Sequence, residues 1–306
     1  MNKKWIKLID PLFMRTTMIL AVSIVVLVVI LLFSMTKQSM LSIHKFGLHF
    51  LFDSVWNPVT EKFGALPFIY GTFVSSVLAL LIAVPISLGI AIYLSEIAPL
   101  WIRQFLGFMV ELLAAIPSII YGMWGIFVLS PFLREFVQPF LCKYFGFLPI
   151  FKGQFYGVGM MTAGIILSIM IIPTISSVSK DIFLSVPLDQ REAAMALGAT
   201  QWETIRLSVL KYAKTGVIGA IILGFGRAVG ETMAVTMVIG NKPEIAISLF
   251  APSYTIAALI ANEFTEAVND LYVSALIEMG LILFALTFAL NIIAKLLIQS
   301  ISGKLR

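Results

Sequence analysis

The stretch SVPLDQREAAMALGATQWETIRLSVLKYAK, residues 185–214, is a polar segment between two long apolar ones. Pro187 suits the first turn of a helix, where its missing N–H costs nothing, and Gly198 suits the left-handed residue that ends a helix. Thr200 and Glu203 then have the T-x-x-E spacing of a capping box, which begins a second helix. The stretch therefore predicts two short helices that meet at a glycine corner.

The first of these predicted helices suits contact with another protein. Ala193, Ala194 and Ala196 keep it thin, so that a second surface can approach its backbone, while Arg191 and Glu192 give it charge. We interpret it as a knob that fits a groove on a partner. An amphipathic hairpin resting on lipid headgroups is the alternative that the composition leaves open.

The composition places the chain in a membrane. Of its 306 residues, 60% are hydrophobic and 12% are charged, and the mean hydropathy is +1.02. Water-soluble domains are nearer half apolar and a quarter charged. One cysteine and two histidines leave no material for a disulfide framework, a zinc site or a Cys–His nucleophile pair. We therefore expect no catalytic residues, no cofactor and no metal.

Six windows of about 20 apolar residues, each enough to cross a bilayer core, occur along the chain. We predict an all-α polytopic membrane protein with six transmembrane helices. The predicted divisions are a cytoplasmic N-terminus and first helix at 1–36, an outer loop at 37–68, a core at 69–298 and a tail at 299–306. The core helices are expected at about 69–94, 104–130, 154–179, 214–240 and 272–297, with a cytoplasmic loop at 185–212.

The distribution of basic residues predicts the orientation. Thirteen of the 21 Lys and Arg residues fall in segments on the side of the N-terminus, seven fall on the other side, and Arg227 lies within a span. Because cytoplasmic loops collect Lys and Arg, we expect both termini in the cytoplasm. The net charge of +5 is explained by this sorting, and no basic patch for nucleic acid remains.

Arg227 and Glu231 are charged residues inside the predicted helix 214–240. An arginine in mid-span costs about 2.5 to 3.5 kcal/mol, so it needs a partner, a wet cavity or a function. Glu231 would lie one turn along the same face and pair with it. Gly226 and Gly230 have the small-xxx-small spacing that lets another helix approach. The pair could simply hold helices together, or Arg227 could be a transient anion site with Glu231 as its resting counter-charge.

Three motifs resemble known families. EAAMALG, residues 192–198, resembles the coupling-helix motif that docks ABC importer permeases on their ATPase, and Glu192, Ala193, Ala194 and Gly198 carry the match. The Ile and Pro that follow in that family are replaced here by Ser208 and Lys211. GRAVGETMAVTMVIGN at 226–241 and ELLAAIPSIIYGMWG at 111–125 resemble the fifth-span and third-span motifs of phosphate transport system permeases.

The resemblance implies a type I ABC importer permease fold with one extra N-terminal helix. It implies that Arg227 and Glu231 lie on the phosphate pathway and that Glu111 and Pro117 belong to the third-span motif, and we count Glu111 with the pathway residues. As a proline inside a span, Pro117 is expected to kink the helix. The implied function is that of a permease subunit in an ATP-driven, high-affinity importer of inorganic phosphate, forming half of the pathway by alternating access. The implied location is the bacterial cytoplasmic membrane.

The implied partners are a second permease subunit, two ATP-binding subunits, an extracytoplasmic phosphate-binding protein and membrane lipid. The chain has no G-x-x-x-x-G-K-[ST] loop, so ATP hydrolysis must come from a partner. One alternative is an ABC permease for another oxyanion such as sulfate. A second is an ion-driven carrier, although carriers usually contain internal repeats and none is found between the two halves.

Overall fold

The structure, a computed structural model, describes residues 3–303. Its regular secondary structure is helical, with no β-strand in that range. Six helical segments are long and apolar enough to cross a membrane, which confirms the predicted number. They are Leu12–Gln38, Leu66–Ile97, Ser118–Phe145, Met160–Leu184, Gln201–Val229 and Asp270–Leu296.

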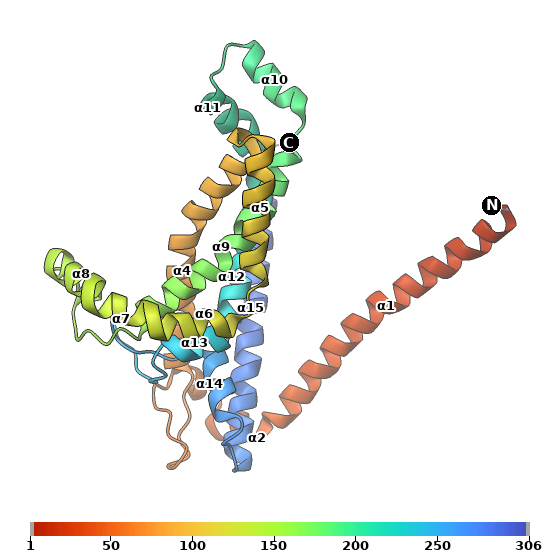
Figure 1. The fold of residues 1–306 in the computed structure, drawn as a ribbon. Helices are drawn as coiled ribbons and strands as arrows, with labels where there is room; N and C mark the ends of the chain where they lie inside the picture. Colours follow the sequence, from red (N-terminus) through yellow and green to blue (C-terminus); the bar gives the residue numbers. More distant parts are fainter. Residues whose placement is uncertain (1–2, 304–306) are drawn as a thin grey trace.

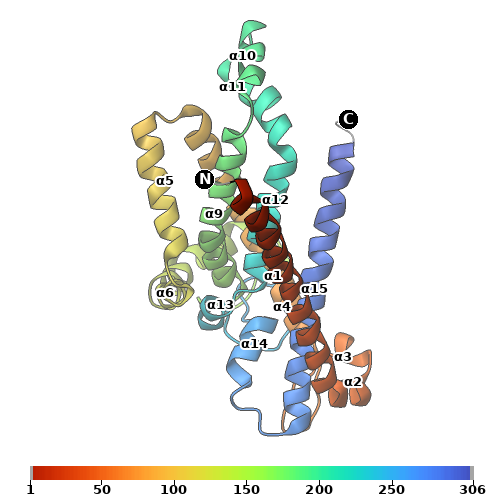
Figure 2. The same cartoon turned by 90° about the vertical axis from the view of Figure 1, so that its right-hand side faces the viewer.

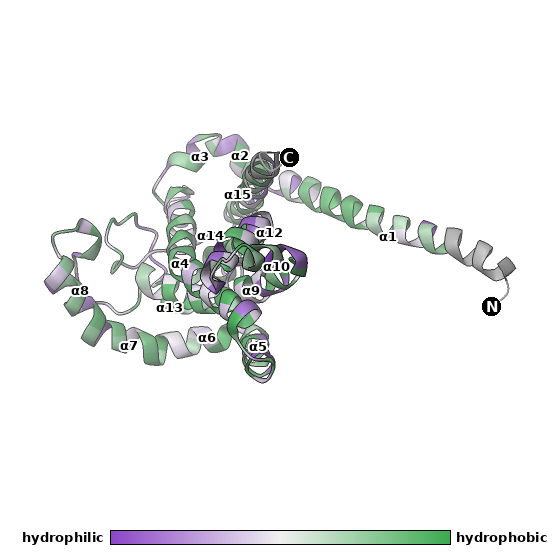
Figure 3. Cartoon of the chain, turned by 90° about the horizontal axis from the view of Figure 1, so that it is seen from above, coloured by the Kyte–Doolittle hydropathy of each residue, from purple (hydrophilic) through white to green (hydrophobic). Residues whose placement is uncertain are grey.

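The helix α1 (Lys3–Gln38) projects away from the rest of the chain (Figures 1 and 3). From Leu12 to Leu31 every side chain is exposed, and contact with the body is made near the C-terminal end, where Met35 lies against Gly280. A helix that is apolar all round must be covered by lipid or by another chain. This is the extra N-terminal helix that the sequence predicted.

The bundle that follows is organised around α9 (Met160–Leu184), most of which is buried inside the chain. α4 (Leu66–Ile92) and α12 (Leu210–Val229) pack along it (Figure 2). Ile166, Ile171 and Ile175 of α9 belong to the buried apolar core of this bundle. The remaining long helices are α5 (Leu100–Ala115) and α15 (Asp270–Gly303). The π-helical turn η1 (Tyr93–Ile97) extends α4.

Short helices lie at one end of the bundle and in the connections between the long helices. α2 (Met40–Phe46) and α3 (His49–Phe52) follow α1, and the rings of Phe46, Phe50 and Phe63 form an aromatic cluster beneath them. The others are η2 (Gly125–Leu129), α7 (Ser130–Phe132), η3 (Leu133–Val137), α8 (Gln138–Phe145), η4 (Pro149–Phe151) and α14 (Ile256–Glu263).

The predicted continuous helix 104–130 is wrong. α5 ends at Ala115, and α6 (Ser118–Trp124) begins after Pro117 and turns across the direction of α5, as α7 and α8 do (Figure 1). A proline forces the residue before it into an extended conformation and cannot donate the next helical hydrogen bond. The expected kink is therefore a full break.

The predicted helix 214–240 is also wrong in its bounds. α12 ends at Val229, and α13 (Met233–Val238) begins after three further residues. At the other end, α11 (Gln201–Thr204) and η5 (Ile205–Val209) run directly into α12, so that the helical segment starts earlier than expected. The apolar run alone could not locate these ends, because hydropathy does not distinguish a helix from a break inside the membrane.

The glycine corner of the polar stretch is confirmed. α10 (Leu188–Ala196) has Pro187 as its N-cap, and Gly198 has a φ of +83° in the left-handed region. The capping box of Thr200 and Glu203 is complete, with each side chain accepting from the other residue's backbone N–H. Figure 2 shows α10 and α11 beyond the ends of the long helices.

Candidate functional site

Arg227 lies in the last turn of α12, where α12, α9 and α6 come together. Its side chain is half-buried, and Nη1 donates a hydrogen bond to the hydroxyl of Thr174 on α9 at 3.0 Å. The guanidinium also lies within Coulombic range of Tyr121 on α6. A fixed cation is thus held where the third and fifth predicted spans are interrupted.

The two interrupted segments pack on each other. Gly122 of α6 lies against Ala234 and Met237 of α13. The hydroxyl of Tyr121 donates to the carbonyl oxygen of Leu113 at 2.8 Å and so satisfies one of the acceptors that the end of α5 leaves free. The motifs at 111–125 and 226–241 are therefore neighbours in space, which their sequence separation did not reveal.

The expected ion pair between Arg227 and Glu231 is wrong. Because α12 ends at Val229, Glu231 no longer lies one helical turn beyond Arg227, and its Oε1 accepts a hydrogen bond from the backbone N–H of Ala234 at 3.4 Å. Among the side chains that the structure describes, no carboxylate lies within ion-pairing distance of Arg227. Its polar partner is a neutral hydroxyl, so the full positive charge is available to an anion.

The other predicted site residues stand apart from this cation. Glu111 is exposed on α5 and has no hydrogen-bond partner in the part of the chain that the structure describes. Gly226 and Gly230 are exposed as well, and a methyl group on Gly226 would meet nothing within 4 Å. This chain therefore does not cover the face that these glycines form, and their packing role stays a prediction.

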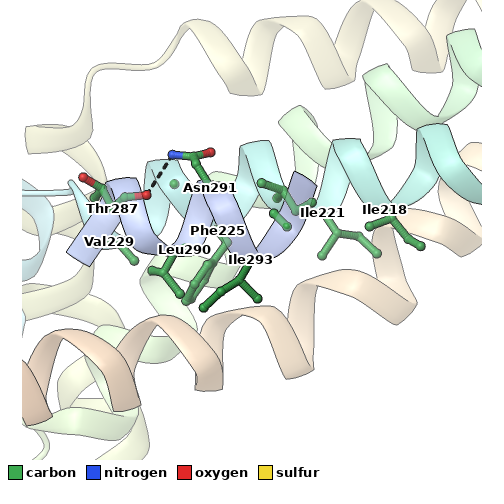
Figure 4. Close-up of a pocket in the computed structure, with 11 residues that line it drawn as sticks. Ile218, Ile221, Phe225, Val229, Thr287, Leu290, Asn291 and Ile293 are labelled. Atoms are coloured by element: carbon green, nitrogen blue, oxygen red, sulfur yellow. Dashed lines mark hydrogen bonds between the residues drawn. The ribbon is translucent and has the colours of Figure 1, made fainter. Parts of the chain in front are cut away.

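An apolar groove of about 390 Å³ lies between α12 and α15 (Figure 4). Its polar members are Thr287 and Asn291, and Asn291 Nδ2 donates to the Thr287 carbonyl at 2.9 Å. The remaining lining is Ile218, Ile221, Ile222, Phe225, Gly226, Val229, Leu290, Ile293 and Ala294. With no cationic side chain in its wall, the groove suits a lipid chain or an apolar helix and does not suit a phosphate or sulfate ion.

The predicted coupling residues divide between two faces of α10. Glu192 and Ala193 are exposed, Ala194 is half-buried, and Gly198 at the corner is exposed. Arg191 turns inward and forms an ion pair with Glu96 at 2.9 Å. Sequence reasoning missed this pair and also missed Thr174. In both cases the available signal was a polar residue at the edge of, or inside, an apolar run.

The chain was compared with known proteins. Residues 86–303 match the family described as binding-protein-dependent transport system inner membrane component. The chain belongs to this family. It is thus a multi-pass inner membrane component of an ABC importer. The part matched begins near the end of α4 and includes α10, the Arg227 region and the bundle helices that follow α4.

Relatives that are similar over nearly the whole chain are phosphate transport system permease proteins. The phosphate transport system permease protein PstC of Mesorhizobium japonicum is 49% identical over 97% of this chain and 92% of its own length. PstC of Pasteurella multocida is 50% identical over 97% of the chain and 94% of its own length. A probable PstC of Methanocaldococcus jannaschii is 36% identical over 95% of the chain and 94% of its own length.

A solved structure supports the fold. The chain resembles a chain of the inward-facing MetNI methionine ABC transporter with a TM-score of 0.54, over 78% of this chain and 94% of that one. The sequence identity is 18%, so the likeness concerns the fold alone. The predicted ABC importer permease architecture is confirmed.

Proposed function

We propose that this chain is a permease subunit of an ATP-driven phosphate importer. Identity of 49% and 50% to PstC proteins over nearly the whole chain carries the proposal. Arg227 supports it, because a guanidinium presents forked donors that match two oxygens of a phosphate and, in this chain, no described carboxylate competes for it. Sulfate import is the second candidate, since a guanidinium binds either oxyanion.

The proposed pathway runs past Arg227, with Glu231 and Glu111 on its walls. The two helix breaks beside Arg227 fit such a role, because irregular backbone at membrane depth is tolerated where it is buried in protein or lines a water-filled cavity. Phosphate would bind transiently, since a conducting site must be weak enough to release its ion. A second permease subunit would cover the exposed faces of α5 and α12 and complete the pathway.

The proposed energy source is a pair of ATP-binding subunits that contact the exposed face of α10 through Glu192, Ala193 and Ala194. Closure of these subunits on ATP would move α10 and open the bundle outward to an extracytoplasmic phosphate-binding protein. Hydrolysis would return it inward. We propose that both termini lie in the cytoplasm of a bacterial cell, in agreement with the excess of basic residues on that side.

Uptake of labelled phosphate at low concentration tests the function, in cells that lack this chain and in cells to which it is restored. We expect restoration to return ATP-dependent uptake that excess sulfate does not inhibit. Uptake without ATP dependence would favour an ion-driven carrier. Inhibition by sulfate would favour the second candidate.

Arg227→Gln tests the site. We expect an assembled complex whose phosphate uptake falls at least a hundredfold, because the amide has no charge and the removed cation binds the anion directly. Arg134→Gln, which changes an exposed arginine beside α8, is the matched control and should leave uptake unchanged. Normal uptake by the Arg227 variant would place the pathway elsewhere.

A further inference from the structure

Arg191 of α10 and Glu96 of η1 form a two-pronged ion pair. Arg191 Nε donates to Glu96 Oε2 at 3.1 Å, and Nη2 donates to Oε1 at 2.9 Å. The side chains are 13% and 9% exposed. A planar guanidinium on a carboxylate in this parallel arrangement fixes orientation as well as distance.

The same guanidinium also holds the end of α9. Nη2 donates to the carbonyl oxygen of Phe183 at 2.7 Å, and Nη1 donates to that of Val186. Arg191 of α10 thus contacts both η1 and the C-terminal end of α9 with the residues that follow it. The Phe183 carbonyl also accepts from the backbone N–H of Val186 at 3.2 Å, so the arginine adds a further donor at the end of α9.

The π-helical turn η1 is the point where several elements meet. It extends α4, and after Ala98 and Pro99 the chain continues into α5. Arg103, in the first turn of α5, donates from Nη2 to the carbonyl oxygen of Ser95 at 2.7 Å. A displacement of η1 is therefore passed to α4 through the backbone and to α5 through both the chain and this hydrogen bond. Short π-helical segments frequently occur at functional sites.

The other ion pairs among the described side chains are exposed or join neighbours in the sequence. Lys45–Glu61 has side chains 45% and 43% exposed, and Lys242–Glu244 has side chains 54% and 58% exposed. Lys180 and Asp181 are neighbours in sequence at 3.8 Å. Exposed pairs contribute little, whereas breaking a buried pair leaves an uncompensated charge. Arg191–Glu96 is thus the buried ion pair that attaches α10 to the bundle.

We propose that the Arg191–Glu96 pair transmits movement of α10 to α4 and α5. Arg191 is a positioning residue: the exposed face of α10, with Glu192, meets the ATPase, and the inward face, with Arg191, moves η1. The inference rests on the proposed function, in which ATP-binding subunits contact α10. Because the bidentate contact resists rotation and translation alike, a rotation of α10 is passed on instead of being lost in a flexible joint.

The test uses the complete complex of this chain, its second permease, its ATP-binding subunits and the phosphate-binding protein, reconstituted in lipid vesicles. The variants are Glu96→Gln and Arg191→Lys, each of which keeps one hydrogen bond but loses the charge or the forked contact. Retention of the ATP-binding subunits, ATP hydrolysis and phosphate uptake are measured on each preparation. Glu61→Gln, in the exposed pair with Lys45, is the matched control.

We expect both variants to retain the ATP-binding subunits and to hydrolyse ATP, while phosphate transported per ATP falls at least tenfold. The double variant Glu96→Gln with Arg191→Lys should be no worse than the poorer single variant, because the two residues act as one unit. Glu61→Gln should keep the native ratio.

An unchanged ratio of phosphate to ATP in both single variants would overturn the inference, and so would losses that multiply in the double variant. Loss of the ATP-binding subunits from both single variants would also overturn it, because the pair would then serve assembly alone. Failure of the proposed function is distinguishable, since the unmodified complex would then show no ATP-driven uptake and the inference would fall with it.

Discussion

Arg227 shows how one side chain can retain a charge in an apolar setting. Its position at the end of α12 removes Glu231 from the same helix face. The hydrogen bond that the guanidinium donates to the Thr174 hydroxyl holds it in place without neutralising it. A half-buried cation with a neutral partner attracts anions more strongly than one in an ion pair, because no opposing charge must be displaced first. Because the Thr174 hydroxyl accepts this hydrogen bond at 3.0 Å, it sets the direction of the guanidinium.

Thr174→Val should weaken transport without disrupting the fold. Valine has nearly the same shape but accepts no hydrogen bond, so Arg227 loses its fixed direction and the transient anion complex loses part of its stabilisation. We expect about a tenfold lower uptake rate, which corresponds to about 1.4 kcal/mol and lies at the lower end for a hydrogen bond to a charged group. Thr174→Ser keeps the hydroxyl and should restore most of the rate. Equal rates in the two variants would show that the hydroxyl has no role.

At the scale of the element, α10 depends on the backbone at its glycine corner. Gly198 has a φ of +83°, and its N–H donates to the carbonyl oxygen of Met195 at 2.9 Å. A residue in this region ends the helix and turns the chain toward α11. The angle between the two short helices is therefore fixed by one residue, which suits a rigid contact for a partner protein.

Gly198→Pro should uncouple ATP hydrolysis from transport. Proline requires a φ near −65° and has no N–H, so both the corner and its hydrogen bond are lost. Gly198→Asn is the control, because asparagine tolerates the left-handed region and keeps the N–H. We expect hydrolysis with little uptake in the proline variant and near-normal coupling in the asparagine variant, measured on the reconstituted complex. Normal coupling with proline would mean that α10 does not act as a rigid element.

The segment between α3 and α4 has a pH-dependent attachment to α2 and to the residue before α15. Glu61 accepts hydrogen bonds from Lys45 on α2 at 2.9 Å and from Asn269 before α15 at 2.7 Å, and the bond from Lys45 is the first cause that lowers the pKa of Glu61 below its ordinary value of 4.5. A lowered pKa in the folded state means that the stabilisation is present above pH 4.5 and is lost as the pH falls through the folded-state pKa.

The difference in melting temperature between the native chain and Glu61→Gln should disappear as the pH falls through the pKa of Glu61. We expect a small difference at pH 7, since the pair is exposed, and no difference once acid has protonated Glu61. Thermal unfolding in detergent at several pH values measures it. A difference that grows on acidification would contradict the assigned direction of the pKa shift.

At the scale of the whole molecule, close backbone contacts hold the segment 240–255, which precedes α14, to α4. A methyl group at Gly71 of α4 would lie 2.2 Å from the carbonyl oxygen of Tyr254, whereas one at Gly89 of the same helix would meet nothing within 4 Å. Thr72 Oγ1 also accepts from the backbone N–H of Ile256 at 3.0 Å. The segment before α14 is thus fixed directly on α4.

Gly71→Ala should destabilise the chain, and Gly89→Ala should not. The clash at Gly71 is with backbone, which cannot rotate away, so we expect a loss of about 1 to 3 kcal/mol, in the range of overpacked cores. Gly89→Ala gains helix propensity of up to about 1 kcal/mol and introduces no clash. Thermal unfolding in detergent measures the melting temperature of each variant. Equal melting temperatures would show that the segment before α14 moves to make room for the added methyl group.

The sequence by itself determined the membrane class, the number of spans, the glycine corner with its capping box, and the family motifs. Each of these depends on local composition or on spacing within one or two helical turns, which a linear chain displays directly. The positions of Pro187, Gly198, Thr200 and Glu203 were sufficient for α10 and α11, because helix ends in water need specific residues to satisfy their free N–H and C=O groups.

Only the tertiary structure decided where the long helices break and which polar groups meet. The apolar runs 104–130 and 214–240 gave no sign that Pro117 ends a helix instead of bending it, or that Gly230 to Thr232 interrupt α12 and α13. The Arg227–Thr174 and Arg191–Glu96 contacts span 53 and 95 residues. Such partners are selected by the packing of α9 against its neighbours, because inside a membrane a polar group must find its partner in whichever helix lies beside it.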